Sequence, residues 1–220
     1  MTETPQKRLA LVTGASRGLG FALAEELAAR SWHVIALGRT LGGLEELDDR
    51  IQARGGSATL AAMDITRDDA MRHLCRDIHD RWGRLDLWAH AAIHAPPMSP
   101  ADHIAGKDWD RCVATNIRAS GFLITMIAPL LAASQPRGTA LFIDDPVAGD
   151  KFMGAYGASK AAQMALARSW QAEGARVGPR VIIEACAPMP TATRARFFPG
   201  EERDRLTPCV QEARRLIDLV

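Results

Sequence analysis

Two residues in the last third of the chain have the chemistry and spacing of an acid–base pair. Tyr156 and Lys160 lie four residues apart in a helix-like run, and Tyr156 is the only tyrosine in the sequence. Residues at this spacing share one helical face, so an ammonium group would lie beside a phenol. An ammonium neighbour lowers the pKa of a phenol from about 10 and helps it exchange a proton with an alcohol or a carbonyl oxygen. Taken alone, the same spacing is more often that of a solvated surface pair.

A second stretch has the composition of a phosphate-binding turn. Residues 13–20 read Thr-Gly-Ala-Ser-Arg-Gly-Leu-Gly, between an apolar run at 9–12 and a helix-like run at 21–28. Gly14, Gly18 and Gly20 carry no Cβ atom, so a ligand can approach the backbone closely. The first N–H groups of the following helix have no partner within the helix and favour an anion. The alternative is a tight strand-to-helix turn without a ligand.

Both stretches belong to a chain in which apolar runs and helix-like runs alternate. We expect strands at 9–13, 33–37, 58–63, 85–92, 139–143 and 180–187. We expect helices from the glycine turn to about residue 30, at about 41–51, 68–82, 109–131 with an interruption near Ser120, 155–175 and 207–220. Continuous apolar strands joined through helices predict an α/β fold, a doubly wound parallel sheet of about six strands covered by helices on both faces. The carboxyl ends of such strands form the ligand site.

Composition excludes several classes of function. The chain has 220 residues, 47% of them apolar, and a formal net charge of +1 with scattered lysines and arginines. We therefore expect one globular domain over residues 1–220 and neither a nucleic-acid nor a membrane partner. The four cysteines are widely spaced and predict no metal site and no disulfide framework. Residues 1–8 hold no apolar run typical of a signal peptide, so we expect a cytoplasmic protein.

Several motifs in one order resemble those of the short-chain dehydrogenase/reductase family. Thr13, Gly14, Gly18 and Gly20 match its TGxxxGxG pattern, and Tyr156 with Lys160 matches its YxxxK pattern. The resemblance runs from about residue 8 to residue 220. It implies a Rossmann-like NAD(P)-binding domain and an oxidoreductase acting on a small carbonyl or alcohol substrate.

The residue after the second strand indicates which dinucleotide binds. Sites for NAD usually place a carboxylate there to hold the ribose 2′-hydroxyl, but here the sequence is Leu37-Gly38-Arg39. Arg39, with Arg17 from the glycine turn, suits the 2′-phosphate of NADP(H); the alternative is that both are solvated surface arginines. The resemblance implies that the cofactor contacts Gly14, Ser16, Arg17, Gly18, Leu19, Gly20, Arg39, Asp64, Ile65, Ala92, Tyr156, Lys160 and Thr193. Thr191 is a second candidate for the position of Thr193, and a lone Asp64 is also typical of a turn or a helix cap.

The resemblance implies three catalytic residues, Tyr156, Lys160 and Asn116. In the family the asparagine supports a water-linked proton path to the lysine; the alternative is an asparagine that caps or kinks its helix. One residue of the family pattern is missing, because no serine occurs between Thr139 and Ala155. The position expected for this serine is occupied by Asp144, Asp145 or Pro146. An ionised aspartate accepts hydrogen bonds but cannot donate one, and it would repel a developing alkoxide.

Two further departures affect the loops around the cofactor. The family's NNAG appears as His90-Ala91-Ala92-Ile93, and its Pro-Gly after the sixth strand appears within Pro188-Met189-Pro190. The sequence also ends where the family usually adds a seventh strand. We therefore expect a homodimer formed through the helices around 108–131 and 155–175.

Two functions remain open at this point. The first is an NADP(H)-dependent reductase or dehydrogenase with Tyr156 as acid and base. The second is an NADP(H)-binding relative with an impaired active site, acting as a sensor, a partner subunit or a scaffold.

Overall fold

The structure is a computed structural model and describes residues 7–220. Six strands form one sheet in the order β3-β2-β1-β4-β5-β6, and every neighbouring pair is parallel. The strands are β1 (Leu9–Thr13), β2 (His33–Gly38), β3 (Ser57–Ala62), β4 (Leu87–His90), β5 (Thr139–Asp144) and β6 (Arg180–Ala185). Every residue of β1 and β4 is buried, as their continuous apolar sequence requires. The chain leaves β1 toward β2 and returns to β4 on the other side, which opens a crevice at the carboxyl ends of these two strands.

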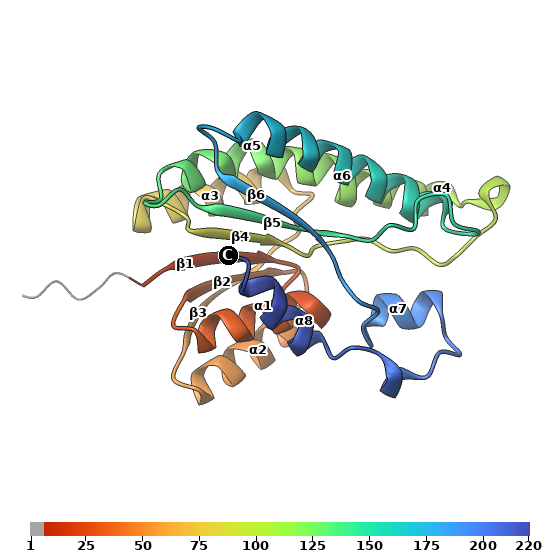
Figure 1. The fold of residues 1–220 in the computed structure, drawn as a ribbon, viewed down its shortest axis with the longest axis horizontal. Coiled ribbons are helices and arrows are strands. Elements are labelled where there is room, and N and C mark those ends of the chain that lie inside the picture. Colours follow the sequence, from red (N-terminus) through yellow and green to blue (C-terminus); the bar gives the residue numbers. More distant parts are fainter. Residues whose placement is uncertain (1–6) are drawn as a thin grey trace, which may run out of the picture.

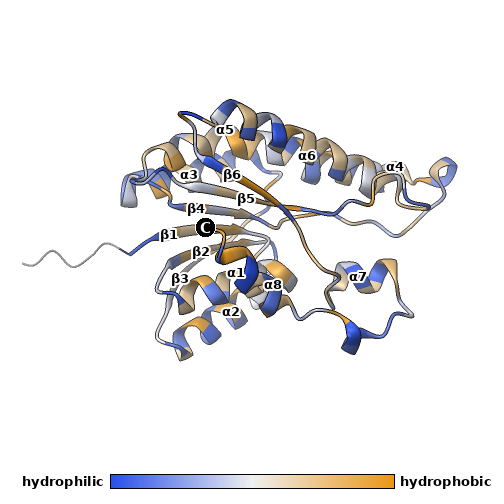
Figure 2. Ribbon diagram, in the orientation of Figure 1, coloured by the Kyte–Doolittle hydropathy of each residue, from blue (hydrophilic) through white to orange (hydrophobic). Residues whose placement is uncertain are grey.

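Helices cover both faces of the sheet (Figure 1). One face carries α1 (Gly18–Ala29), α2 (Leu41–Ala53) and α8 (Cys209–Ile217), and the other carries α3 (Asp68–Trp82), α5 (Ala119–Ala132) and α6 (Gly154–Gly174). Each layer has its own buried hydrophobic cluster, and the sheet contributes side chains to both clusters. In Figure 2 the helices carry hydrophobic and hydrophilic residues side by side, as expected when one face is covered and the other is solvated. The predicted doubly wound parallel sheet of six strands, in one domain, is confirmed.

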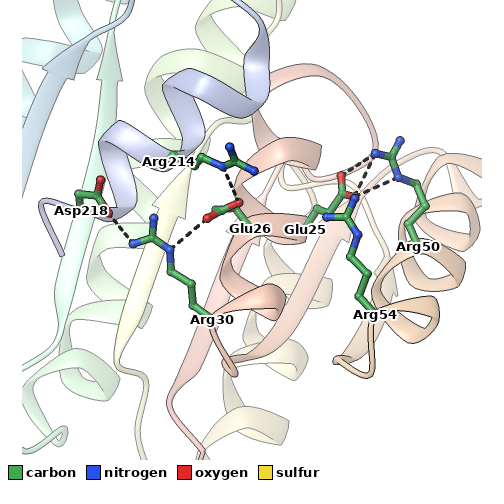
Figure 3. A network of polar contacts seen from close by, with 7 residues as sticks. All are labelled: Glu25, Glu26, Arg30, Arg50, Arg54, Arg214 and Asp218. Carbon is green, nitrogen blue, oxygen red and sulfur yellow. Dashed lines mark hydrogen bonds and ion pairs between the residues drawn. The ribbon is translucent and has the colours of Figure 1, made fainter.

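Ion pairs join the three helices of the first layer (Figure 3). Glu25 of α1, 7% exposed, accepts hydrogen bonds from Arg50 of α2, and Arg54 next to α2 forms a second ion pair with it at 3.0 Å. The next residue, Glu26 of α1, pairs with Arg214 of α8 at 3.2 Å. Both flanking helices are therefore fixed to α1, and with it to the glycine turn from which α1 starts.

Most bounds differ from the prediction by a few residues, and three differences have a clear physical reason or add an element. β4 covers Leu87–His90 rather than 85–92, because the Leu85 N–H bonds to the carbonyl of Leu130 instead of a strand. The helix interruption lies at 113–118, where one π-helical segment, η2 (Val113–Arg118), joins α4 (Gly106–Cys112) to α5. The expected loop after residue 188 contains a further helix, α7 (Ala192–Phe197), which starts where the Thr191 hydroxyl accepts the N–H of Arg194. Figure 1 shows α7 beyond the carboxyl ends of the strands.

The continuous helical stretch Gly106–Ala132 is long and apolar enough to cross a membrane by length and composition. Core helices of globular domains meet the same test, and here the α5 part of the stretch packs against α3, α6 and β4.

The glycine turn requires close contact between backbones. Gly14 has φ +83°, and a Cβ atom on it would lie 2.7 Å from the nitrogen of Ala92. A Cβ on Gly20 would collide with the carbonyl oxygen of Gly14. These two positions therefore tolerate only glycine, and they bring the start of α1 against the loop that follows β4.

Two neighbouring glycines of α2 differ in how closely they approach the glycine turn at residues 13–20. A Cβ on Gly43 would lie 2.5 Å from the carbonyl oxygen of Ser16, whereas a Cβ on Gly42 meets nothing within 4 Å. We expect Gly43→Ala to lower the free energy of unfolding by about 1–3 kcal/mol through steric overlap. Gly42→Ala, the matched control, should raise it by about 0.5–1 kcal/mol, because alanine favours a helix. Urea denaturation measures both values, and equal effects of the two substitutions would contradict this packing.

Candidate functional site

A cavity of about 650 Å³ lies at the carboxyl ends of the strands. Every residue predicted to contact the cofactor lines it: Gly14, Ser16, Arg17, Gly18, Leu19, Gly20, Arg39, Asp64, Ile65, Ala92, Tyr156, Lys160 and Thr193. These residues come from the glycine turn, from the ends of β2 and β3, from the loop after β4, and from α6 and α7. Residues more than 170 positions apart in the sequence thus meet around one space.

One end of the cavity suits an anion. The twelve-residue helix α1 starts at Gly18, so its first N–H groups open onto the cavity. Arg17 and Arg39 are exposed at the same end, and within residues 7–220 neither forms a hydrogen bond or an ion pair with another side chain. Two unpaired guanidinium groups beside a helix N-terminus favour a phosphate group.

Asp64 has a structural contact as well as a place in the cavity wall. Its Oδ1 accepts hydrogen bonds from the N–H and the hydroxyl of Thr66, both at 2.9 Å. This is the turn contact that the sequence left open for a lone aspartate. Ile65, which follows it, is 6% exposed and also reaches the cavity.

At the other end, the Tyr156 hydroxyl donates a hydrogen bond to Oδ2 of Asp145, at 2.9 Å. Of the three residues expected near the missing serine, Asp145 is therefore the one that reaches the phenol. Tyr156 is 5% exposed. Burial, the charge of Asp145 and the hydrogen bond to it raise the pKa of Tyr156 well above its ordinary value. The expected lowering of this pKa by Lys160 is not found in the structure, because Asp145 is the phenol's hydrogen-bond partner.

Lys160 lies one helical turn from Tyr156, as predicted, but its ammonium group bonds elsewhere. Its Nζ donates to Oε1 of Gln163 at 2.7 Å, and the side chain is 6% exposed. Burial lowers the pKa of Lys160 to about 8, against the opposing charges of Asp144 and Asp145. A lysine with this pKa exchanges protons more readily near neutral pH than a solvated one.

Gln163 begins a buried chain of polar groups that crosses the core. Its Nε2 donates to Ser120 Oγ at 2.8 Å, and the Ser120 hydroxyl donates to the carbonyl of Asn116. His90 Nε2 lies 2.8 Å from the same Oγ, and its Nδ1 lies 2.7 Å from Thr13 Oγ1. Because the Ser120 hydroxyl donates its proton to the Asn116 carbonyl, Ser120 Oγ can only accept a hydrogen bond from His90. His90 therefore carries its proton on Nε2, and its Nδ1 accepts the Thr13 hydroxyl. The chain therefore links Lys160 to the first residue of the glycine turn.

Asn116 lies behind the cavity and does not line it. It is fully buried in η2, where Oδ1 accepts the N–H of His94 at 2.7 Å and Nδ2 donates to the His94 carbonyl and to Ser159 Oγ. These contacts fix the loop after β4 against α6. Asn116 lies in the π-helical segment, and its backbone carbonyl accepts the Ser120 hydroxyl of the polar chain that leads to Lys160. Its catalytic role stays a prediction.

Ile93 and Met189, the two bulkier residues in the altered family loops, both line the cavity. Thr193 lines it as well, and Thr191 caps α7 while its methyl group lies against Gly18. Both candidate threonines therefore stay at the cavity wall.

Sequence reasoning missed Gln163 and the connection through Ser120 and His90. A signal for Gln163 was present: a glutamine three residues after Lys160 shares its helical face, and this face had to be buried. No pattern in the sequence indicates the contact between His90 and Ser120, because it depends on how β4 packs against α5.

The buried histidine makes stability depend on pH. Burial, with a smaller contribution from the charge of Lys160, lowers the pKa of His90 to about 3 from its ordinary 6.5. Between these pH values the unfolded chain binds the proton and the folded chain does not. The contribution of neutral His90 to the free energy of unfolding is therefore fully present above about pH 6.5 and is lost as the pH falls. The loss from this group approaches about 1.4 kcal/mol per pH unit. His90→Asn should give a shallower decline between pH 6.5 and 4.5 in urea denaturation than the wild type or His73→Asn, an exposed control. An unchanged slope in His90→Asn would contradict the assignment.

Comparison with known proteins agrees with this geometry. The family profile of short chain dehydrogenases matches residues 8–202. The chain is 32% identical over 135 residues to a gluconate 5-dehydrogenase of Gluconobacter oxydans and 33% identical over 175 residues to a tropinone reductase homolog of Arabidopsis thaliana. These matches cover 61% and 76% of this chain, and the chain spans 51% and 64% of the two relatives' lengths.

A solved structure is similar over nearly the whole chain. It is a metagenomic short-chain oxidoreductase in complex with NADP, with a TM-score of 0.80 and 26% sequence identity, covering 96% of this chain and 89% of that one. The chain that forms this parallel sheet, glycine turn and buried tyrosine–lysine pair belongs to the short-chain dehydrogenase family of oxidoreductases.

Proposed function

We propose that this protein is an NADP(H)-dependent oxidoreductase that moves a hydride between the nicotinamide and a small carbonyl or alcohol substrate. The observation that carries the proposal is the single cavity in which the glycine turn, Arg17 and Arg39 face one end and Tyr156 and Lys160 face the other. Members of the family bind NAD(P), and α1 starts at the cavity wall, where its first N–H groups can receive a pyrophosphate.

The preference for NADP(H) rests on charge at the adenosine end. Arg17 and Arg39 have no side-chain partner in the part of the chain that the structure describes, and the residue pair at the end of β2, Gly38-Arg39, offers no carboxylate to a ribose hydroxyl. A 2′-phosphate would neutralise both guanidinium groups through charge-assisted hydrogen bonds. The structural similarity to an oxidoreductase solved with NADP supports the same preference.

In this proposal Tyr156 is the acid of the reduction. Its raised pKa keeps the phenol protonated at neutral pH, so the hydroxyl has a proton to donate to a carbonyl oxygen. The bound cofactor, in its reduced form, supplies the hydride. Lys160 and the chain through Gln163 hold the helical face that carries the phenol.

The second candidate function is NADP(H) binding with impaired catalysis. The observation that favours it is the hydrogen bond from Tyr156 to Asp145, in a site without the serine of the family pattern. Loss of one donor to a developing oxyanion typically lowers the rate by about 10²–10³. A homodimer through α4–α5 and α6 and a cytoplasmic location stay predictions under either function.

Arg39 provides the test of cofactor preference. Arg39→Ala should weaken NADPH binding by about 10–100-fold, the loss expected for one charged hydrogen bond, and change NADH binding less than about twofold. Arg67→Ala, at an exposed arginine outside the cavity, is the matched control. Fluorescence titration of both dinucleotides measures the effect. Equal losses for NADPH and NADH would overturn the 2′-phosphate assignment.

Tyr156→Phe separates the two functions. We expect it to abolish NADPH oxidation with a small diketone, by about 10³-fold or more, because no other cavity residue replaces the phenol as acid. NADPH affinity should stay within about threefold, which shows that the fold is intact. Wild-type protein that binds NADPH but turns over no compound in a broad carbonyl panel would favour the second function, and undiminished activity of Tyr156→Phe would exclude the proposed acid.

A further inference from the structure

The carboxylate of Asp145 faces the cavity without a cation paired to it. Its Oδ2 accepts only the Tyr156 hydroxyl, and the side chain is half-buried in the cavity wall. The cations around it are bonded to other groups: Arg168 to Asp144, Arg194 to Glu201 and Lys160 to Gln163. Across residues 7–220 no lysine or arginine forms an ion pair with Asp145. The catalytic end of the cavity therefore presents a carboxylate that has no direct ion pair among the described residues, while Lys160 and Arg194 lie close enough to interact with its charge.

An apolar cluster borders this charge on the side of Tyr156. The Phe197 ring of α7 lies 5.0 Å from the Tyr156 ring, measured between centroids, and is 4% exposed. Met153, also 4% exposed, packs in the same small cluster, and Ile93 and Val147 border it. One anion among aromatic and aliphatic side chains suits a ligand with an apolar body and a positive charge.

We infer that Asp145 makes this site select substrates whose reacting group is a nitrogen cation: a protonated imine in the direction of reduction, and a secondary amine in the direction of oxidation. The inference rests on the proposed NADP(H)-dependent hydride transfer and changes the substrate class from C=O to C=N. A carbonyl gains negative charge as it accepts hydride, which the carboxylate of Asp145 opposes. An iminium ion keeps part of its positive charge in the transition state, which the carboxylate stabilises relative to the free neutral imine.

The step balances with the groups already named. The imine nitrogen takes one proton from solvent, and the resulting cation hydrogen-bonds to Asp145. Hydride from the reduced nicotinamide forms the new C–H bond while the π pair of C=N moves to nitrogen. The products are the secondary amine and the oxidised nicotinamide, and Tyr156 keeps its proton throughout.

Binding of a product amine tests the charge without turnover. Isothermal titration of the NADP⁺-loaded full chain should show tetrahydroisoquinoline, a cation at pH 7, binding at least about tenfold tighter than isochroman, its neutral oxygen isostere. Asp145→Asn should remove that difference, and Asp150→Asn, in the same loop but outside the cavity, should keep it. Equal binding of the two probes by the wild type, or a preference that survives Asp145→Asn, would overturn the inference.

Turnover separates this inference from the function on which it rests. We expect NADPH-dependent reduction of dihydroisoquinoline to exceed that of tetralone in kcat/KM by at least about tenfold, and Asp145→Ser to reverse the order. NADPH binding with a faster ketone reaction, unaffected by Asp145→Ser, would overturn the preference for nitrogen cations and leave the oxidoreductase standing. Failure of the wild type to bind NADPH would overturn both.

Discussion

The close approach of backbones around the end of β1 is the constraint on which the rest of the site depends. Gly14 lies against the loop after β4, Gly20 against Gly14, and Gly43 of α2 against Ser16. A side chain at any of these positions would separate the elements, so the turn holds β1, β4, α1 and α2 together at one point. The ion pairs from Glu25 and Glu26 then fix α2 and α8 to the same helix. The cavity forms where this cluster meets the carboxyl ends of β4 and β5.

The two ends of the cavity differ in charge. Within residues 7–220, Arg17 and Arg39 have no side-chain partner, and together with a helix N-terminus they make the adenosine end positive. At the catalytic end, the Asp145 carboxylate accepts the Tyr156 hydroxyl and has no direct ion pair in the same range. Lys160 does not offset that carboxylate through a hydrogen bond, because Gln163 holds its ammonium group on the core side. The phenol therefore stays protonated, and its immediate partner accepts rather than donates. Cofactor binding and substrate chemistry therefore depend on different charged groups.

The sequence predicted the parts of this structure that depend on local pattern. Apolar runs such as 9–12, glycines at fixed spacing and the four-residue interval from Tyr156 to Lys160 are enough to place the fold, the family and the cavity wall. The remaining features depend on contacts between distant segments. Which of Asp144, Asp145 and Pro146 meets the phenol depends on the path of the chain after β5. The contact of Gln163 with Ser120 depends on the packing of α5 against α6. The helix α7 forms in a proline-bounded stretch whose six helical residues give little periodic signal.

A crystal structure of the protein with NADP⁺ tests the central claim most directly, because that claim concerns where one molecule lies in one cavity. We expect the 2′-phosphate between Arg17 and Arg39, the pyrophosphate at the start of α1, and the nicotinamide beside Tyr156 and Asp145. Density for the dinucleotide elsewhere, or a 2′-phosphate that contacts neither arginine, would contradict it.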